Sequence, residues 1–536
     1  MTATELSGVS SLDAHYAEFR TLVKLAQDHL VHGRLEVAAV YAQVAGCYAW
    51  LNHTGLFASP ELENIIGKLG AHLAPVINSR SCMSPPREVL HVVTQVYQTG
   101  GSTQAIACWI EQDHGRHHRV CITRQGPSLP PEKILTRLKA PSDLLLLDAK
   151  RGSLLDRAAA LRVAATGADV ILLHSHPYDV VPIIAFSSVS GFPPVIYVNH
   201  GDHVFWLGTS VANIVLNMRD SGHNLTTKRR GIEAVRSVVM MRPLSLTGRN
   251  LSRDEAKRQL GASPEQVLVV TAADASKYHP IAPPSFLDMV VPVLERHKNA
   301  LLFAAGPMLQ DDWTVAKNRT GGRVSALGRL PNTILLQQAA DVYLDSFPFS
   351  SLTSLIEAGS YGTPVITYRG HPKECAVLSA DTCGVDEHMR CPSDPEEFQR
   401  ELSRMITDAE WRHDLGAKIQ RAIIKTHEGD TWRASVSRIY DLATRLNLPP
   451  ALGVAERGIG SLDILVDLVM KKTGYSQGFS GAMRNNLGLF PVGWRIATWM
   501  CLVCDGVFPS VQNLLPEWLL PPLARWWRLV RQFRYF

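Results

Sequence analysis

The sequence predicts an α/β protein built from two consecutive Rossmann-like units, each a doubly wound parallel sheet. Two observations predict this fold class. Short apolar runs alternate with helical stretches in two successive trains, and continuous apolar runs are typical of parallel strands that helices cover on both faces. The 536 residues, 46% hydrophobic and 19% charged, are also enough for two or three domains with full cores.

The chain divides into four parts by pattern. Residues 12–77 repeat apolar side chains at spacings of three and four, which predicts helices, and Pro85 and Pro86 end that pattern. The polar stretch 245–266 separates the two trains of strands. We therefore expect an N-terminal helical region, an N-terminal Rossmann-like domain, a C-terminal Rossmann-like domain and a helical, basic-aromatic extension, over 1–83, 84–245, 246–448 and 449–536.

The expected strands are short, apolar and rich in β-branched residues. Those of the first unit are 89–96, 118–123, 143–148, 169–176, 194–200 and 213–218. Those of the second are 267–273, 300–306, 323–328, 341–347 and 364–368, with helical patterns from 395 to 446 closing this unit. In such folds ligands bind at the carboxyl ends of the strands, so a site between the two units is expected.

Charge and cysteine content narrow the function class. The net charge of +5 is too small to favour nucleic acid as a partner. Nine scattered cysteines fit reduced thiols, and the N-terminus has no secretory signal pattern, so a cytoplasmic protein is expected. After Glu517 only basic charges remain, interleaved with Trp and Phe. This tail predicts peripheral contact with a membrane surface, or else packing on the sheet units.

The stretch "DVYLDSFPFSSLTSLIEAGSYGTPVITY" from Asp341 carries the most specific pattern. A strand ends near Ser346 and a helix follows, with Ser350 or Ser351 as the expected N-cap. A helix that begins at the carboxyl end of a strand presents N–H groups and a positive dipole, which favours phosphate. The alternative is a helix start that is capped and nothing more.

This stretch, with "LGRLP" before it, resembles the nucleotide-sugar half of GT-B glycosyltransferases, closest in spacing to O-GlcNAc transferase and its bacterial relatives. The resemblance covers about 265–370 well and 85–245 only in topology. It implies that Ser351, Thr353 and Ser354 hold the diphosphate of a nucleotide-sugar donor, a UDP-sugar. It also implies Glu357 on the ribose, Lys277 on the pyrophosphate, and the backbone of Leu327, Gly328 and Arg329 on the base.

The sequence departs from the family at two positions. Leu352 stands where the family has a histidine, and Phe349 where retaining enzymes with paired glutamates have an acid. This favours an inverting site and leaves the stereochemical outcome open. No Asp-x-Asp occurs, so no metal and no further cofactor are expected. The helix dipole, hydroxyls and Lys277 would stabilise the departing diphosphate instead.

The first unit holds candidates for the base that takes the acceptor proton. His200 and Asp202 are the first choice and His176 the second, because each follows a predicted strand at its carboxyl end. Alternatively these side chains fill hydrogen-bonded loop positions, or His174, His176, His200 and His203 bind a metal. The resemblance makes 84–245 the acceptor domain and 246–448 the nucleotide-sugar domain, and it implies that the turn at Gly100 and Gly101 lets the backbone approach donor or acceptor.

The predicted function is therefore transfer of a sugar from a nucleotide-sugar to a hydroxyl of a glycan, lipid-linked glycan or protein. Two alternatives stay open. One is a UDP-sugar 2-epimerase of the same fold, and the other is a non-catalytic scaffold that binds nucleotide-sugar or glycan at a membrane.

Overall fold

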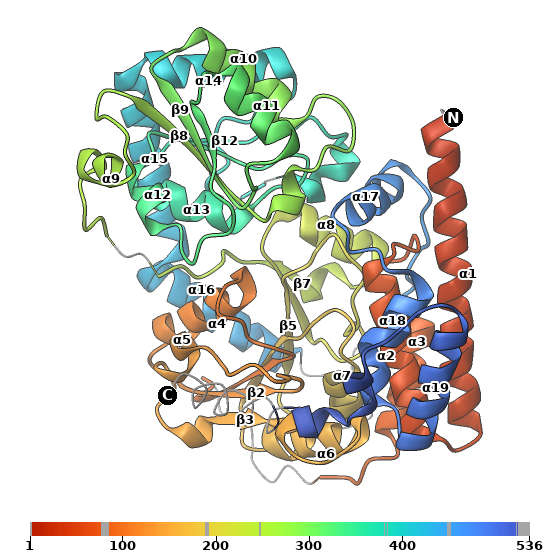
Figure 1. The fold of residues 1–536 in the computed structure, drawn as a ribbon. Helices are drawn as coiled ribbons and strands as arrows, with labels where there is room; N and C mark the ends of the chain where they lie inside the picture. Colours follow the sequence, from red (N-terminus) through yellow and green to blue (C-terminus); the bar gives the residue numbers. More distant parts are fainter. Residues whose placement is uncertain are drawn as a thin grey trace, which may run out of the picture.

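The structure is a computed structural model that describes residues 3–76, 85–187, 192–245, 248–379, 381–382, 384–446, 452–520 and 523. Two parallel sheets form two lobes, and helices from both ends of the chain pack together beside the first lobe (Figure 1). The predicted pair of doubly wound units is confirmed.

The first sheet has seven parallel strands in the order β3-β2-β1-β4-β5-β6-β7. They are β1 (Glu88–Val93), β2 (His117–Ile122), β3 (Leu144–Leu146), β4 (Val170–His174), β5 (Val195–Asn199), β6 (Ile214–Asn217) and β7 (Ser237–Val239). Six match the predicted runs, and β7 was not predicted. The helices of this lobe are α4 (Gly101–Gln112), α5 (Glu132–Leu135), α6 (Leu154–Ala165), α7 (Val180–Phe186) and α8 (Asp220–Arg229).

The second sheet has five parallel strands in the order β10-β9-β8-β11-β12. They are β8 (Val267–Ala272), β9 (Ala300–Ala305), β10 (Val324–Ala326), β11 (Val342–Leu344) and β12 (Val365–Ile366), and all five were predicted. The helices are α9 (Arg253–Gln259), α10 (Phe286–Arg296), α11 (Asp311–Arg319), α12 (Ile334–Ala339), α13 (Leu352–Ser360), α14 (Pro395–Thr407) and α15 (Ala409–His427).

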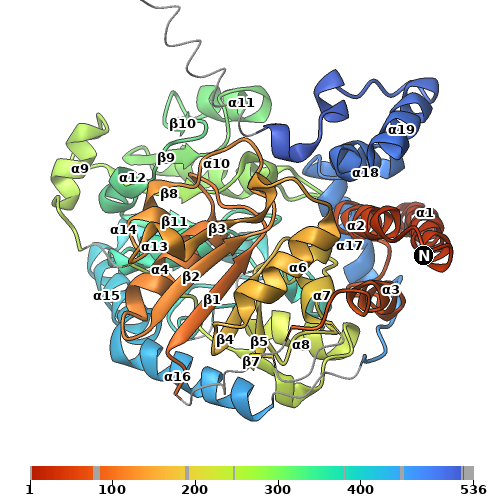
Figure 2. The same ribbon diagram turned by 90° about the horizontal axis from the view of Figure 1, so that it is seen from below.

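The next helix, α16 (Gly429–Arg445), returns to the first lobe. Its Trp432 and Tyr440 are buried in one core with Val89 of β1 and Ile196 of β5. Figure 2 shows α16 passing beneath the first sheet. The expectation that the helices of 395–446 all close the second unit was therefore wrong for the last of them: its apolar face covers the first sheet.

Both ends of the chain pack on the first lobe. The N-terminal helices α1 (Ala3–Val31), α2 (Leu35–Leu51) and α3 (Pro60–Gly70) share one core with β1 and β4. The extension forms α17 (Ser461–Lys472), α18 (Gly478–Asn486) and α19 (Val492–Cys504), which pack against α1 and α2.

The extension is anchored at its end by a buried ion pair. Glu517 accepts hydrogen bonds from Arg124 Nε at 2.9 Å and Arg157 Nη2 at 3.1 Å. This is the predicted packing alternative for the region up to 520; most of the Arg/Trp tail, 524–536, lies outside the described residues. No helix within the described ranges is long and apolar enough to cross a membrane.

Candidate active site

The carboxylate of Asp345 fixes the loop between β11 and α13. It accepts hydrogen bonds from the hydroxyls of Ser350 and Thr367 at 2.6 and 2.9 Å. It also accepts from the backbone N–H groups of Ser346 and Ser351 at 2.9 and 2.8 Å. Burial raises the pKa of Asp345, although these hydrogen bonds oppose the shift. One carboxylate thus ties the end of the strand to the start of the helix, a role that the sequence analysis missed.

Ser351 occupies the N-cap position of α13, but its hydroxyl makes no capping bond to the described first turn. The predicted N-cap position is therefore confirmed, but the predicted capping bond is absent from the described helix start. The Ser350 hydroxyl donates to Asp345 instead, and that of Ser351 donates to Ser354 Oγ at 3.4 Å. The charged carboxylate of Asp345 accepts stronger hydrogen bonds than a neutral group does, so the loop is held against Asp345. The first-turn N–H groups are left for an anion at this helix end.

Arg242 joins the two lobes at the start of α13. Its Nη1 donates to Thr353 Oγ1 at 2.8 Å, and its Nη2 donates to the carbonyl of Gly101 at the start of α4. Arg242 is 8% exposed, and its Nε is buried with no partner in the described structure. Burial lowers its pKa, and the charge of Glu357 opposes that shift. The guanidinium thus keeps an unused donor beside the helix end.

The sequence analysis also missed Arg242. The only signal was a lone arginine in the apolar run "VVMMRPL", directly before the polar stretch that separates the units. Gly101, in contrast, lies where the turn was expected to approach the donor. A Cβ there would lie 3.2 Å from Arg242 Nη2 and 3.3 Å from Thr353 Oγ1, so a larger residue would crowd this contact.

Lys277 lies on the loop after β8, on the other side of the helix start. Its Nζ donates to the carbonyl of Ser350 at 2.7 Å and lies 4.4 Å from the ring centroid of Phe349. The ring of His203, from the first lobe, lies 4.5 Å from the same phenyl ring. Burial lowers the pKa of Lys277 to about 8, although the charge of Asp345 opposes the shift. Lys277 therefore stays cationic at neutral pH.

Glu357 lies one turn beyond Thr353 on α13, as the spacing predicted. Its Oε2 accepts from Gln337 Nε2 at 3.2 Å. Burial raises its pKa, while Gln337 and the charge of Arg242 oppose the shift. The carboxylate retains acceptor capacity for a polyol such as ribose.

The predicted base-binding segment and the glycine turn of the first lobe lie against each other. Arg329 Nη2 donates to Thr99 Oγ1 at 2.7 Å, next to Gly100, which is the N-cap of α4 with a φ of 135°. Gly328 has a φ of 66°, and its carbonyl accepts from the Gly306 N–H at 2.8 Å. The positive φ at Gly100 and Gly328 is tolerated because both lack a Cβ.

His200 and Asp202 lie in different environments, although they are two residues apart. His200 Nε2 lies 2.9 Å from His174 Nδ1, and burial together with the Arg242 charge lowers its pKa to about 3. Asp202 accepts from Arg219 Nε and Nη2 at 2.6 and 2.9 Å. Burial opposes its charged form, but the Arg219 charge outweighs burial and lowers the pKa. Asp202 is thus held as an ion pair and is poorly suited to accept a proton.

His176 lies in an aromatic cluster. Its ring stacks on Tyr97 at 6.1 Å and on Trp50 at 6.5 Å between centroids, and its Nδ1 lies 3.2 Å from the Tyr178 hydroxyl. Burial lowers its pKa to about 4. No contact in the described structure links His176 to His200, so the two predicted bases belong to separate clusters. No group of three or more His, Cys, Asp or Glu among the described residues could hold a metal ion.

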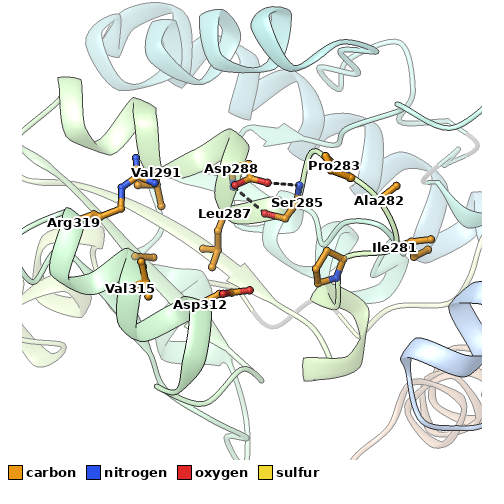
Figure 3. A pocket seen from close by; sticks show the side chains of 12 residues that line it. Ile281, Ala282, Pro283, Ser285, Leu287, Asp288, Val291, Asp312, Val315 and Arg319 are labelled. Atoms are coloured by element: carbon orange, nitrogen blue, oxygen red, sulfur yellow. Dashed lines mark hydrogen bonds between the residues drawn. The ribbon is translucent and has the colours of Figure 1, made fainter.

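A pocket of about 400 Å³ lies elsewhere, between α10, α11 and the loop before α10 (Figure 3). The pocket is lined by the apolar side chains of Leu287, Val291 and Val315 and by the charged side chains of Asp312 and Arg319. None of the predicted site residues lines it. The charged groups around the start of α13, not this pocket, define the candidate site.

No family model matches the sequence, and no curated protein matches it either. Solved structures do. HepE from Anabaena, in complex with UDP and glucose, aligns with a TM-score of 0.50 at 14% identity over 66% of this chain and 99% of its own. A glycosyltransferase from Rickettsia africae ESF-5 aligns with a TM-score of 0.50 at 12% identity over 67% of this chain and 99% of its own.

An O-GlcNAc transferase from Thermobaculum terrenum covers 82% of this chain at 14% identity, but its TM-score of 0.46 is too low to support an argument. At these identities the likeness shows the fold alone. The chain has the GT-B fold, as the resemblance implied.

Proposed function

We propose that the protein is a glycosyltransferase that moves a sugar from a UDP-sugar to a hydroxyl acceptor. The observation that carries the proposal is the group of unpaired cations at the start of α13. Neither Lys277 nor Arg242 forms a salt bridge with a carboxylate in the described part of the chain, and both lie at the start of α13, Arg242 buried and Lys277 half-buried. Cations that are shielded from water and not paired with a carboxylate are costly, and a diphosphate would neutralise them.

The remaining donor contacts follow from this placement. With the diphosphate at Thr353 and Ser354, Glu357 one turn further along α13 accepts hydrogen bonds from the ribose. Backbone groups of Gly328 and Arg329 bind the base. The cations act when the bond from the anomeric carbon to the diphosphate breaks, because negative charge then collects on the leaving group. HepE, which has the same fold, was solved with UDP and glucose, and this supports UDP as the nucleotide.

On the acceptor side, His200 is the base of this proposal. The lowered pKa of His200 keeps its ring neutral at physiological pH, as a base requires. Arg242, whose charge contributes to that shift, contacts Thr353 of α13. As the acceptor oxygen attacks the anomeric carbon, its proton passes to His200. The acceptor is a hydroxyl of a glycan, lipid-linked glycan or protein. The seven described cysteines are free thiols, which supports a cytoplasmic setting.

The test is UDP binding and turnover with matched lysine variants. UDP should raise the melting temperature of the whole protein more than GDP, CDP or dTDP, because a ligand of the folded state stabilises it. Lys277→Met should weaken UDP binding about tenfold or more, the cost of one charge-assisted contact. Lys425→Met, on the exposed end of α15, removes the same charge and should leave UDP binding unchanged.

Product analysis distinguishes the alternatives. A transferase releases UDP from UDP-glucose or UDP-N-acetylglucosamine and leaves C2 of the sugar unchanged, whether the acceptor is a hydroxyl compound or water, whereas a 2-epimerase yields the C2 epimer. A scaffold binds UDP without turnover. Absence of UDP binding in the wild-type protein would overturn the proposal.

A further inference from the structure

Three buried histidines and the half-buried His200 form a continuous chain of ring-to-ring hydrogen bonds across the first sheet. His118 Nδ1 lies 3.0 Å from His91 Nε2, and His91 Nδ1 lies 3.2 Å from His174 Nε2. His174 Nδ1 lies 2.9 Å from His200 Nε2. At the other end, His118 Nε2 lies 3.0 Å from the backbone carbonyl of Asp113. His91 and His174 each use one ring nitrogen for the preceding link and the other ring nitrogen for the next, so the hydrogen bonds run through both rings without a break.

The strand register explains how four strands supply one chain. In the parallel register, each histidine of the chain pairs with a residue on the next strand. The next histidine lies two residues beyond that paired residue, toward the carboxyl end of its strand. The partner of His118 is Val89, two residues before His91, and the partner of His91 is Leu172, two residues before His174. On the next strand, Leu172 pairs with Ile196 of β5, and this register places His174 opposite Val198, two residues before His200. An even offset keeps all rings on one face of the sheet while the chain advances toward its carboxyl edge.

That face is covered, so the chain is shielded from water from His118 to His174, and only His200 at its end is half-exposed. Strands β2, β1, β4 and β5 lie side by side in Figure 2, with α4 and α16 against them. Trp109 of α4 packs edge-on against His174 at 6.2 Å, and Trp432 of α16 packs against Trp109 at 5.3 Å. His91 and His174 are 0% and 3% exposed. Sheet positions that an aliphatic core would fill carry imidazoles instead.

The Asp113 carbonyl sets the direction of every bond in the neutral chain. A carbonyl can only accept, so His118 Nε2 carries the proton and His118 Nδ1 accepts from His91 Nε2. By the same step His91 Nδ1 accepts from His174, and His174 Nδ1 accepts from His200 Nε2. The outcome is that His200 Nδ1 is left unprotonated, with its lone pair free to take a proton. The chain thus prepares the tautomer that a base requires.

The two ends differ in how they treat positive charge. At His200 burial and the Arg242 charge both lower the pKa, and no carboxylate in the described ranges opposes them. At His118 burial also lowers the pKa, and Arg116 and His117 add to the shift, but the Asp113 carboxylate 3.6 Å from Nε2 opposes it.

Asp113 is itself held in place by the Tyr440 hydroxyl at 3.1 Å and by Arg116 Nη1. A proton taken up at the site is therefore better accommodated at the far end of the chain.

We propose that the chain is a proton relay that carries the acceptor proton from His200 to His118, a role that rests on the proposed transferase function. The acceptor O–H bond breaks as an N–H bond forms at His200 Nδ1. His200 Nε2–H then passes to His174 Nδ1, His174 Nε2–H to His91 Nδ1, and His91 Nε2–H to His118 Nδ1. One N–H bond breaks for each that forms, and His118 becomes imidazolium beside Asp113. The proton returns by the reverse path to solvent after the product leaves.

The first experiment needs no substrate. In the whole protein with ¹⁵N-labelled histidine, NMR should show all four rings as neutral Nε2–H tautomers at neutral pH. Scalar coupling should appear across each N–H···N bond. On acidification the first of the four to become imidazolium should be His118. A His200 that carries its proton on Nδ1, or that becomes imidazolium before His118, overturns the proposal, whether or not the protein is a transferase.

The second experiment separates proton transfer from simple positioning. In His91→Gln the carboxamide can accept from His174 and donate to His118, so it orients both rings but cannot pass a proton on. In His91→Phe both functions are lost. With UDP-glucose as donor and water as acceptor, both variants should lower kcat for UDP release about tenfold or more, with the KM for UDP-glucose unchanged. Wild-type kcat in His91→Gln overturns the relay.

The control is His117→Gln on β2, next to His118. His117 points away from the chain, to Glu88 and Asp143 at 2.8 and 3.0 Å, so this variant should keep the wild-type kcat. If His91→Phe fails to fold, as a melting curve would show, His91→Gln still decides. If the wild-type protein releases no UDP, the proposed function fails while the NMR titration still tests the relay.

Discussion

The carboxyl edges of the two sheets handle charge in opposite ways. Around the first sheet, charged side chains are paired with each other: Asp202 with Arg219, and Glu517 with Arg124 and Arg157. The buried Arg230 there donates to the backbone carbonyls of Asp202 and Val204, and the imidazoles at this edge are hydrogen-bonded to each other.

At the start of α13 on the second sheet, Lys277 and Arg242 are cations without a carboxylate salt bridge in the described structure, and Asp345 is satisfied by hydroxyls and N–H groups. Removing one partner of a buried pair is strongly destabilising, whereas a cation without a carboxylate partner can bind an anionic ligand. The comparison therefore supports the proposals of anion binding at the second edge and proton transfer at the first.

The largest expected effect is on the first edge. His200→Asn removes the proposed base and should lower kcat for UDP release by about 10²–10⁴-fold, the range for general-base catalysis, with little change in donor KM. Steady-state kinetics with UDP-glucose measures it. His176→Asn, in the separate aromatic cluster, should lower kcat far less. An equal loss of kcat in that variant would show that His200 is not the base.

Breaking a pair near the first edge should affect stability and not donor binding. Glu517→Ala leaves Arg124 and Arg157 buried without their counter-ion, and we expect a loss of about 3–5 kcal/mol in the free energy of unfolding. Denaturant unfolding measures it, with UDP affinity as the second readout. Glu111→Ala is the matched control, because the side chain of Glu111 is 44% exposed in its pair with Arg137, against 11% for Glu517. That change should cost less than about 1 kcal/mol.

Asp345→Asn tests whether one carboxylate organises the second edge. The amide keeps one acceptor but points N–H donors at groups that are donors themselves, so we expect a loss of about 1–3 kcal/mol. A thermal melt measures the loss, and UDP affinity should fall with it because the start of α13 shifts. An unchanged melting temperature would show that the loop holds its shape without Asp345.

The smallest effect concerns pH. Lys277 has a pKa of about 8 in the free protein, below its usual value, so it loses its charge as the pH rises through 8. A bound diphosphate would restore the charge. UDP affinity, measured calorimetrically, should therefore fall about tenfold between about pH 7 and about pH 9.5. Lys277→Arg stays charged over this range and should flatten the profile; an equally steep fall in that variant would rule out Lys277 as the source.

Much of the fold could be predicted because parallel strands buried on both faces are continuous apolar runs. Eleven of the twelve strands carried that pattern. The edge strand β7 was missed, and α16 looked like any amphipathic helix, with nothing local to say which sheet its apolar face covers. In the candidate site, the roles of Thr353, Glu357 and Gly101 stay predictions from the resemblance. The N-cap position was predicted correctly, but its capping bond was not, because Asp345 is a competing acceptor that lies outside the helix.

The sequence by itself determined the two sheets, the helix that starts at the carboxyl end of β11 and the presence of histidines near strand ends, because these depend on periodicity and on residues close along the chain. Only the tertiary structure decided which charges pair and which stay free. Arg242 meets Thr353 across 111 positions, and His91 meets His174 across 83. Pairing depends on distances of a few ångströms between residues far apart in sequence, and the register of the parallel strands, which no local pattern encodes, brings them together.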